Sequence, residues 1–347
     1  MNEPRRPTIT DIAKRAGVTK AAVSFALNDQ PGVSAATRER IRRIAREVGW
    51  QPNSAARALS DGRAGAFGLV IDRPAGILGA EPFFMQLIAG IQGELAPGHT
   101  ALLFTVAEDS AAEIELYRTW WGQRRVDGVF LVDLRVNDPR VSVLKELALP
   151  TVVIGAPEGA GGLSAVWTDD ASAARTVVDH LAQLGHRRIA RVTGMGDLWH
   201  TRIRTDAFLD AARHSGIDAH CVTADYTAEG GADATTALLD GPNPPTAIVF
   251  DNDLMAVSGL GAAQRAGKHV PRELSVVSWD DTVLCELVHP ALTALTRDVK
   301  SYGAHAARRL LELAAGAAVG DRVEPPPVLN ARASTSRASL RKDAGRR

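Results

Sequence analysis

Residues 10–28 read TDIAKRAGVTKAAVSFALN, and residues 31–53 continue with PGVSAATRERIRRIAREVGWQPN. The first stretch contains two short apolar patterns of helical spacing. They are separated at Gly17, because glycine tolerates the backbone angles of a sharp turn. Thr19 can cap the second of the two helices. Two short helices joined by a glycine turn, the second with a polar and varied outer face, are typical of a helix-turn-helix that reads DNA.

A third helix is predicted after Ser34, which can cap it, because apolar residues recur at helical spacing as far as Val48. Its outer face carries five arginines: Arg38, Arg40, Arg42, Arg43 and Arg46. Such a charged face is either simply solvated or, beside a DNA reader, contacts phosphates. Pro52 ends this helix. A short alanine-rich segment at 55–60 follows, and a glycine-containing linker then leads into the rest of the chain.

The charge of the chain is distributed unevenly. Residues 1–63 hold 12 Lys and Arg against 6 Asp and Glu, residues 64–330 hold 22 against 33, and residues 331–347 hold 6 against 1, so the net charges of +6, −11 and +5 sum to zero. A basic head on an acidic body is typical of a nucleic-acid-binding domain attached to a body that phosphates repel. We therefore expect four parts: a helix-turn-helix DNA-binding domain at 1–51, a hinge helix and linker at 52–65, a body at 66–330 and a loosely ordered basic tail at 331–347.

The body alternates apolar strand runs with helical segments. One series of strand runs lies at 67–71, 101–106, 128–132 and 151–154, and a second lies at 189–193, 220–223, 247–250 and 275–278. Strands connected by helices predict a doubly wound parallel α/β sheet. Two successive series resemble the paired lobes of the periplasmic-binding-protein fold, in which a small ligand sits in the cleft between the lobes.

These motifs resemble those of the lactose-repressor (LacI/GalR) family of bacterial transcription regulators. The family pattern T-I-x-D-I-A-x-x-A-G-V-T/S-x-x-x-V-S-x-x-L-N fits at 8–28, P-x-V-S-x-x-T-R fits at 31–38, and G-W/Y-x-P-N at 49–53 leads into an A-x-x-L segment that ends at Leu59. The resemblance continues to about Asp298. It implies a repressor that binds a palindromic double-stranded operator as a homodimer and responds to a small effector held between the lobes.

The resemblance assigns DNA contacts to the second helix and to the hinge. The DNA-binding residues that it implies are Thr19, Lys20, Ala21, Ser24, Phe25, Asn28, Arg57 and Leu59. Lys20 can donate to guanine acceptors, whereas Phe25 either offers an apolar contact to a thymine methyl or packs partly into the headpiece core. Leu59 matches the hinge leucine that wedges into the central base step from the minor groove, and Arg57 either enters that groove or holds phosphate.

The resemblance also implies effector-binding residues in the body: Phe84, Trp167, Arg204, Tyr226, Asn252, Asp280 and Arg297. The arginine fork of Arg204 and the carboxylate of Asp280 can grip vicinal hydroxyls, which favours a sugar or polyol, although some family members bind nucleobases. Tyr226 aligns with a ring that packs on the ligand, and an aromatic wall is expected from Trp167 or Phe84.

Two residues near the expected cleft have alternative roles. Asn252 and Asp253 follow a strand where the cleft should open, and Asp253 either faces the ligand or braces the loop. Arg297 lies where the chain crosses between the lobes, so it serves either the ligand or the hinge.

Other classes of protein fit the sequence less well. The segment at 261–269 superficially resembles a phosphate loop, but five residues separate its glycines and His269 replaces the required Ser or Thr. The sequence has neither an H-E-x-x-H motif nor paired C-x-x-C motifs, so we expect no enzyme activity, cofactor or metal. The lack of an apolar leader or a long apolar run predicts a cytoplasmic protein with no membrane partner. A ligand-binding protein without a gene-control role would explain only the body, and a nucleoid-type DNA binder would explain only the head.

Overall fold

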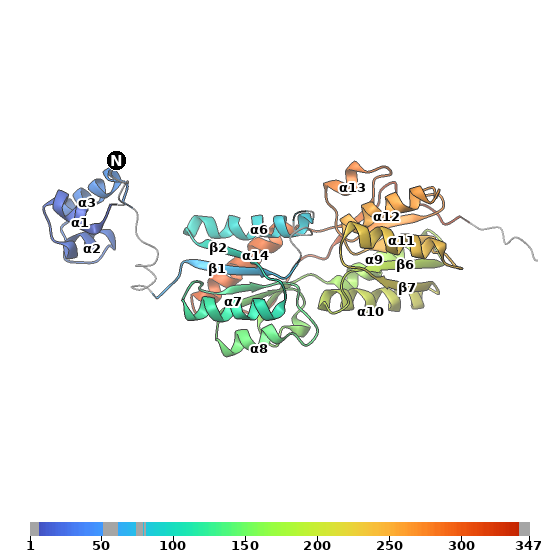
Figure 1. Ribbon diagram of the computed structural model, residues 1–347, viewed down its shortest axis with the longest axis horizontal. Coiled ribbons are helices and arrows are strands. Elements are labelled where there is room, and N and C mark those ends of the chain that lie inside the picture. Colours follow the sequence, from blue (N-terminus) through green and yellow to red (C-terminus); the bar gives the residue numbers. More distant parts are fainter. Residues whose placement is uncertain (1–6, 51–61, 74–78, 80, 340–347) are drawn as a thin grey trace, which may run out of the picture. The chain divides into compact units, whose positions relative to one another are not determined.

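The computed structural model describes residues 7–50, 62–73, 79 and 81–339. The chain divides into two compact units, Met1–Ala64 and Gly65–Arg347. The first unit is a bundle of three helices, α1 (Ile9–Ala16), α2 (Lys20–Leu27) and α3 (Ala35–Glu47), as Figure 1 shows. The predicted helix-turn-helix and third helix are therefore confirmed.

Side-chain caps set the starts of these three helices. The hydroxyls of Thr8, Thr19 and Ser34 each accept a hydrogen bond from a backbone N–H in the first turn that follows. Gly17 ends α1 in the left-handed region, with φ of 65°, which explains the glycine at this turn. The inward faces of the three helices form one small core, with Ile12 and Ile41 fully buried in it.

The body contains two six-stranded sheets, one in each lobe. Lobe 1 has the strand order β11-β5-β4-β3-β1-β2, and its strands are β1 (Ala66–Ile71), β2 (Ala101–Val106), β3 (Val129–Leu131), β4 (Thr151–Ile154), β5 (Ser164–Trp167) and β11 (Arg322–Val323). Its helices are α6 (Pro82–Leu95), α7 (Ser110–Gly122), α8 (Pro139–Glu146) and α14 (Val299–Ala314). Helices α6 and α14 cover one face of the sheet, and α7 and α8 cover the other (Figure 1).

Lobe 2 repeats this plan with the strand order β12-β10-β9-β8-β6-β7. Its strands are β6 (Arg188–Thr193), β7 (Asp218–Thr223), β8 (Ala247–Phe250), β9 (Ser275–Ser278), β10 (Thr293–Thr296) and β12 (Val328–Asn330). Its helices are α9 (Asp170–Gln183), α10 (Trp199–His214), α11 (Ala228–Asp240), α12 (Asp253–Arg265) and α13 (Val283–Leu287). All strand pairs in the two sheets are parallel except β10 with β12, so the predicted doubly wound, two-lobed body is confirmed.

The chain crosses between the lobes three times, after β5, after β10 and after β11. In each lobe, the carboxyl ends of the parallel strands carry the loops that approach the other lobe (Figure 1). The crossovers therefore place the carboxyl ends of the two sheets against each other. Because ligands of open parallel sheets bind at this end of the strands, the space between the lobes is where a ligand site is expected.

The prediction of a loose tail from residue 331 onward is wrong for residues 331–339. The hydroxyl of Ser334 is buried and donates to the Val276 carbonyl oxygen at 2.6 Å, and the Val276 N–H donates to the Ser334 carbonyl oxygen at 2.9 Å. Arg332 forms an ion pair with Asp281 at 2.7 Å. The basic, Ser-rich composition misled the prediction, because these small hydroxyls bond to β9 and β10 of lobe 2 instead of to water.

Candidate functional site

The outer face of α2 presents the side chains that were predicted to read DNA. Thr19 caps this helix, its hydroxyl accepting from Ala22 N–H at 3.1 Å, and Lys20 and Ala21 are exposed in the first turn. Phe25 is 40% exposed and does not belong to the buried core of the head, so its contact with DNA stays the prediction. The remaining predicted residues of α2 are Ser24, which is half-buried, and Asn28, which is exposed.

Arg38 has a structural role that the sequence did not reveal. Its guanidinium donates to the carbonyl oxygens of Phe25 at 3.1 Å and of Gln30 at 2.7 Å, and it pairs with Asp29 at 3.2 Å. This arginine therefore holds the C-terminal end of α2 against α3. Arg42 also pairs with Asp29, whereas Arg40 is exposed on the surface of α3. The predicted hinge residues Arg57 and Leu59 lie outside the described residues.

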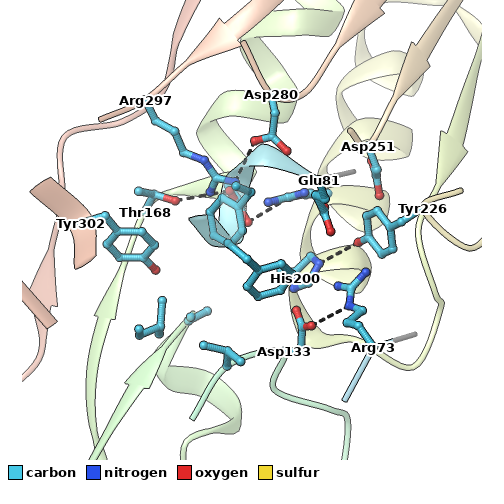
Figure 2. Close-up of a pocket in the computed structure, with 18 residues that line it drawn as sticks. Arg73, Glu81, Asp133, Thr168, His200, Tyr226, Asp251, Asp280, Arg297 and Tyr302 are labelled. Atoms are coloured by element: carbon cyan, nitrogen blue, oxygen red, sulfur yellow. Dashed lines mark hydrogen bonds and ion pairs between the residues drawn. The ribbon is translucent and has the colours of Figure 1, made fainter. Parts of the chain in front are cut away.

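A cavity of about 70 Å³ lies between the two lobes of the body. Figure 2 shows its wall, which is built from both lobes and from the crossover segments. Charged and aromatic side chains dominate the wall: Arg73, Glu81, Phe83, Phe84, Asp133, Asp170, His200, Arg204, Tyr226, Asp251, Asp280, Arg297 and Tyr302. The volume corresponds to only a few water molecules, so a sugar would require side chains or lobes to move apart.

Five of the seven predicted effector-binding residues line this cavity: Phe84, Arg204, Tyr226, Asp280 and Arg297. Trp167 does not, because it packs into the core on the α7 and α8 side of the lobe 1 sheet. Asn252 is fully buried and caps α12, accepting from Met255 N–H at 2.9 Å and donating to the Tyr226 carbonyl oxygen at 3.0 Å. Asp253 accepts from Thr282 and so braces the loop before α13.

Arg204 and Asp280 do not form the free pair that the sequence suggested. Arg204 lies 3.0 Å from Asp170, and Asp280 lies 2.9 Å from Arg297. Burial acts to raise the pKa of Asp170, but the charge of the nearby Arg204 guanidinium opposes this effect and helps to hold the pKa below its ordinary value. Each predicted group therefore enters the cavity as one half of an ion pair, with its partner supplied by a distant part of the chain.

Tyr226 forms an aromatic platform under an arginine from the other lobe. The Arg73 guanidinium lies 4.3 Å from the ring centroid, and the tyrosine hydroxyl bonds to His200 at 2.8 Å. A Cβ atom at Gly194 would lie 1.8 Å from the tyrosine ring, so only glycine leaves room for the ring here. Burial, followed by the charge of Arg204, lowers the pKa of His200 to about 4, which leaves this histidine neutral at pH 7.

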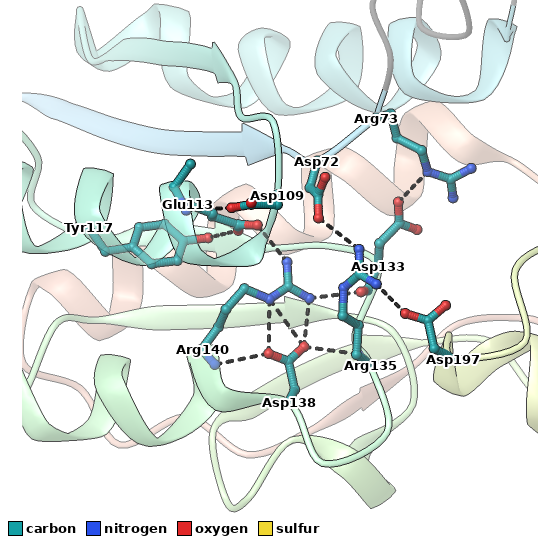
Figure 3. Close-up of polar contacts among 11 residues, drawn as sticks. Asp72, Arg73, Asp109, Glu113, Tyr117, Asp133, Arg135, Asp138, Arg140 and Asp197 are labelled. Carbon is teal, nitrogen blue, oxygen red and sulfur yellow. Dashed lines mark hydrogen bonds and ion pairs between the residues drawn. The ribbon is translucent and has the colours of Figure 1, made fainter.

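A second group of contacts joins the lobes beside the cavity, where the loop after β3 meets the loop after β6 (Figure 3). Arg135 pairs with Asp72 of its own lobe at 2.7 Å and with Asp197 of lobe 2. The backbone N–H of Trp199 donates to the Leu134 carbonyl oxygen at 2.8 Å. These contacts join the two lobes through protein groups of their own.

Several cavity residues were missed by the sequence analysis. Arg73, Asp133 and Asp251 follow the carboxyl ends of β1, β3 and β8, and Asp170 follows β5. A search for charged residues immediately after each predicted strand would have found most of them, because these ends converge at the cleft.

Glu81→Gln is expected to stabilise the effector-free protein at pH 8 but not at pH 4. Burial raises the pKa of Glu81 from 4.5 to about 7, against the opposing charge of Arg73. Because the folded-state pKa lies above the unfolded one, stability that is present below pH 4.5 is lost as the pH rises to about 7. Urea denaturation should give a gain on the order of 1–3 kcal/mol at pH 8. A variant no more stable than wild type at pH 8 would contradict this account.

No group of three or more His, Cys, Asp or Glu side chains among the described residues could hold a metal ion. No helix in the described ranges is long and apolar enough to cross a membrane.

Comparisons with known proteins agree with this arrangement. Residues 8–53 match the bacterial regulatory proteins of the lacI family, and residues 178–335 match the periplasmic binding protein-like domain. The chain is 32% identical over 322 residues to the HTH-type transcriptional regulator CelR of Thermobifida fusca, covering 91% of this chain and 94% of CelR. It is 31% identical to the HTH-type transcriptional repressor CytR of Escherichia coli K12, covering 90% of this chain and 91% of CytR.

Solved structures of transcriptional regulators are also similar to this chain. The lac repressor dimer bound to operator and the anti-inducer ONPF superposes with a TM-score of 0.84 at 25% identity, covering 96% of this chain and all of the repressor chain. A complex of the transcriptional regulator CelR with cellobiose superposes with a TM-score of 0.73 at 28% identity, covering 95% of this chain and all of the other.

Proposed function

The chain belongs to the lacI family of bacterial regulatory proteins, and we propose that it represses transcription as a homodimer on a palindromic operator, under the control of a hydroxylated small molecule bound between its lobes. It is a DNA-binding transcriptional regulator, as its named relatives are. The observation that carries the proposal is a cavity lined by polar groups from both lobes, in a chain whose head exposes the outer face of α2. A ligand-binding protein without a gene-control role would leave that head unexplained.

Three observations support a sugar or polyol as the effector. The cavity wall offers both guanidinium donors and carboxylate acceptors, which suit hydroxyl groups that donate and accept. Tyr226 lines the cavity and supplies an aromatic ring on which the apolar side of a sugar ring can pack once the Arg73 guanidinium that stacks on it moves aside. The CelR relative has a structure in complex with cellobiose, a sugar.

The homodimer is proposed from exposed apolar side chains in both lobes. In lobe 1 these are Met85 on α6 and Phe104 on the edge strand β2, and in lobe 2 they are Val283 and Leu287 on α13. An apolar surface of this kind is expected to be covered by a second copy, and the related lac repressor is a dimer on its operator. Because an operator lies on bacterial DNA, we place the regulator in the cytoplasm.

We expect footprinting to reveal a palindromic operator of roughly 14–20 base pairs with a central pyrimidine–purine step, since a two-fold dimer imposes two-fold symmetry on its site. Genome-wide binding would locate the site, and a mobility-shift titration with candidate sugars would then test whether operator affinity changes.

Lys20→Ala should alter base preference at particular half-site positions, whereas Leu59→Ala should weaken binding and reduce bending. Protection of a single half-site without a repeat would contradict the dimer. A set of bound sugars, none of which changes operator affinity, would contradict the effector role.

A further inference from the structure

The carboxylates of the cavity wall are matched with arginines, with one exception. Asp133 pairs with Arg73 at 2.8 Å, and Asp170 and Asp280 pair with Arg204 and Arg297 as described above. Asp251 accepts from the guanidinium of Arg191, a residue behind the wall, at 2.8 Å. Among the described residues, no cationic side chain forms an ion pair with the remaining carboxylate, Glu81.

Glu81 is nevertheless buried and directed into the cavity. Glu81 is only 5% exposed. The side chain of Asn252 lies close enough to favour the charged form of Glu81, but the Oε2 atom of Glu81 has no hydrogen-bond partner within the described part of the chain. Although it lies at the start of α6, its carboxylate does not cap that helix. Figure 2 shows it among the cavity side chains, on the side of Tyr226. A buried and unsatisfied carboxylate oxygen is costly, so its retention in a binding cavity points to a ligand group that meets it.

The surroundings of Glu81 decide what that ligand group is. Arg73 lies nearby, just after β1, and its charge opposes the rise in the pKa of Glu81. Its Nε pairs with Asp133 and its guanidinium stacks on Tyr226, while its buried Nη1 forms no hydrogen bond or ion pair with Glu81 or with any other group in the described part of the chain. Asp133 and Asp280, at the ends of β3 and β9, add negative charge around Glu81, and their repulsion adds to the effect of burial in raising its pKa to about 7. With the other carboxylates matched, the cavity has one uncompensated negative charge when Glu81 is ionised.

Three kinds of ligand group can be compared against this charge. A second carboxylate or a phosphate would be repelled. A neutral hydroxyl can donate one hydrogen bond but leaves the charge uncompensated. A protonated amine supplies several donors together with the opposite charge, which gives a charge-assisted bond in a buried setting.

We propose that Glu81 selects an effector that carries a protonated amine beside its hydroxyl groups, such as an amino-substituted sugar or polyol. This inference rests on the proposed effector role of the interlobe cavity and names the ligand class that the cavity prefers.

The test compares matched ligands that differ in one group. Calorimetry at pH 8 would titrate the full-length protein with 6-amino-6-deoxy-D-glucose, D-glucose and D-glucuronate, with the corresponding galactose series, and with D-glucamine against D-sorbitol. We expect the amine to bind at least about tenfold more tightly than its hydroxyl counterpart in at least one series, and the carboxylate to bind most weakly. Glu81→Gln should bring the amine-to-hydroxyl ratio close to one. Glu115→Gln, on the exposed surface of α7, is the matched control and should keep the wild-type ratio.

Acidification provides a second measure. The amine preference of the wild type should shrink as the pH falls from 8 to 6 and Glu81 takes up a proton, since an alkylamine with a pKa of about 10 stays charged over this range. The ratio for Glu81→Gln should stay unchanged. Glu81→Met, which removes the charge without adding an amide, would give the same comparison if the glutamine variant misfolds.

The outcomes separate this inference from the proposed function. Equal or weaker binding of the amine in every series, no binding of any amine, or a preference that survives Glu81→Gln would overturn the assignment to Glu81. If a neutral sugar then binds and changes operator affinity, the regulator function stands while the amine preference falls. Amine preference without any change in operator affinity would support the Glu81 assignment and contradict the regulatory role.

Discussion

Replacing Arg140 with methionine is expected to lower the free energy of unfolding by about 3–5 kcal/mol, because it leaves two buried carboxylates without their cation. Arg140 is 1% exposed and lies 2.8 Å from Glu113 and 2.6 Å from Asp138 (Figure 3). It also donates to the Asp133 carbonyl oxygen at 2.8 Å. The substitution should therefore disturb the loop after β3, which carries Asp133 into the effector cavity.

Urea denaturation at pH 7 would measure this loss. Arg118→Met is the matched control, because Arg118 forms an exposed pair with Glu115 on α7 and should contribute no more than about 1 kcal/mol. Adding Glu113→Gln to Arg140→Met should recover part of the stability. Burial already raises the pKa of Glu113, so its carboxylate charge is unfavourable once the Arg140 cation is gone, and the glutamine removes that charge. A loss below about 1 kcal/mol for Arg140→Met would mean that the buried network does not hold this lobe together.

The three-helix head was predictable because its determinants are local. Caps at Thr19 and Ser34 and the glycine turn at Gly17 act within a few residues, so each can be identified in a short stretch of sequence. Arg38 shows the limit of this approach. Its position on the outer face of α3 suggested a phosphate contact, yet its bonds reach back to carbonyl oxygens at the end of α2, a contact that periodicity does not reveal.

The cavity was predictable only in part because its contacts are distant in sequence. Arg204 and Asp280 were expected there, but the pairing of Arg204 with Asp170 joins helix α10 to the start of α9, which local patterns cannot connect. Trp167 shows a different limit. Successive side chains of a strand point to opposite faces, so Thr168 can line the cavity while its neighbour Trp167 packs into the core.

Glu81 had no signal in the sequence at all. No motif or periodicity marks it, and its importance appears only when the carboxylates and arginines of the folded cavity are matched. Such a residue can be found only by matching each carboxylate with its arginine in the folded protein, and a single sequence does not give these distances.

Asp280→Ala and Arg204→Ala are each expected to weaken effector binding by about 2–4 kcal/mol, or roughly 30- to 1,000-fold, while operator affinity without effector stays close to that of wild type. Both residues are buried in the cavity wall, with 5% of Arg204 and 9% of Asp280 exposed, and each contacts the opposite charge of a partner. Removing one member loses its contact with the ligand and strands the other charge. Calorimetry with a sugar that binds wild type, together with operator titrations, would measure both effects and should identify regulators that bind DNA but no longer respond.

The double variant Arg204→Ala with Asp170→Asn separates contact with the ligand from support of the wall. If Arg204 acts only by neutralising Asp170, removal of both charges should restore effector binding, because no uncompensated carboxylate remains. If the guanidinium itself donates to the effector, the double variant should bind as weakly as the single one, and this is the result that we expect. The corresponding pair, Asp280→Ala with Arg297→Met, applies the same logic to the other ion pair at 2.9 Å. Recovery of wild-type affinity in both double variants would assign these four residues to the wall and leave the groups that contact the effector to be sought at Glu81, Arg73 and Tyr226.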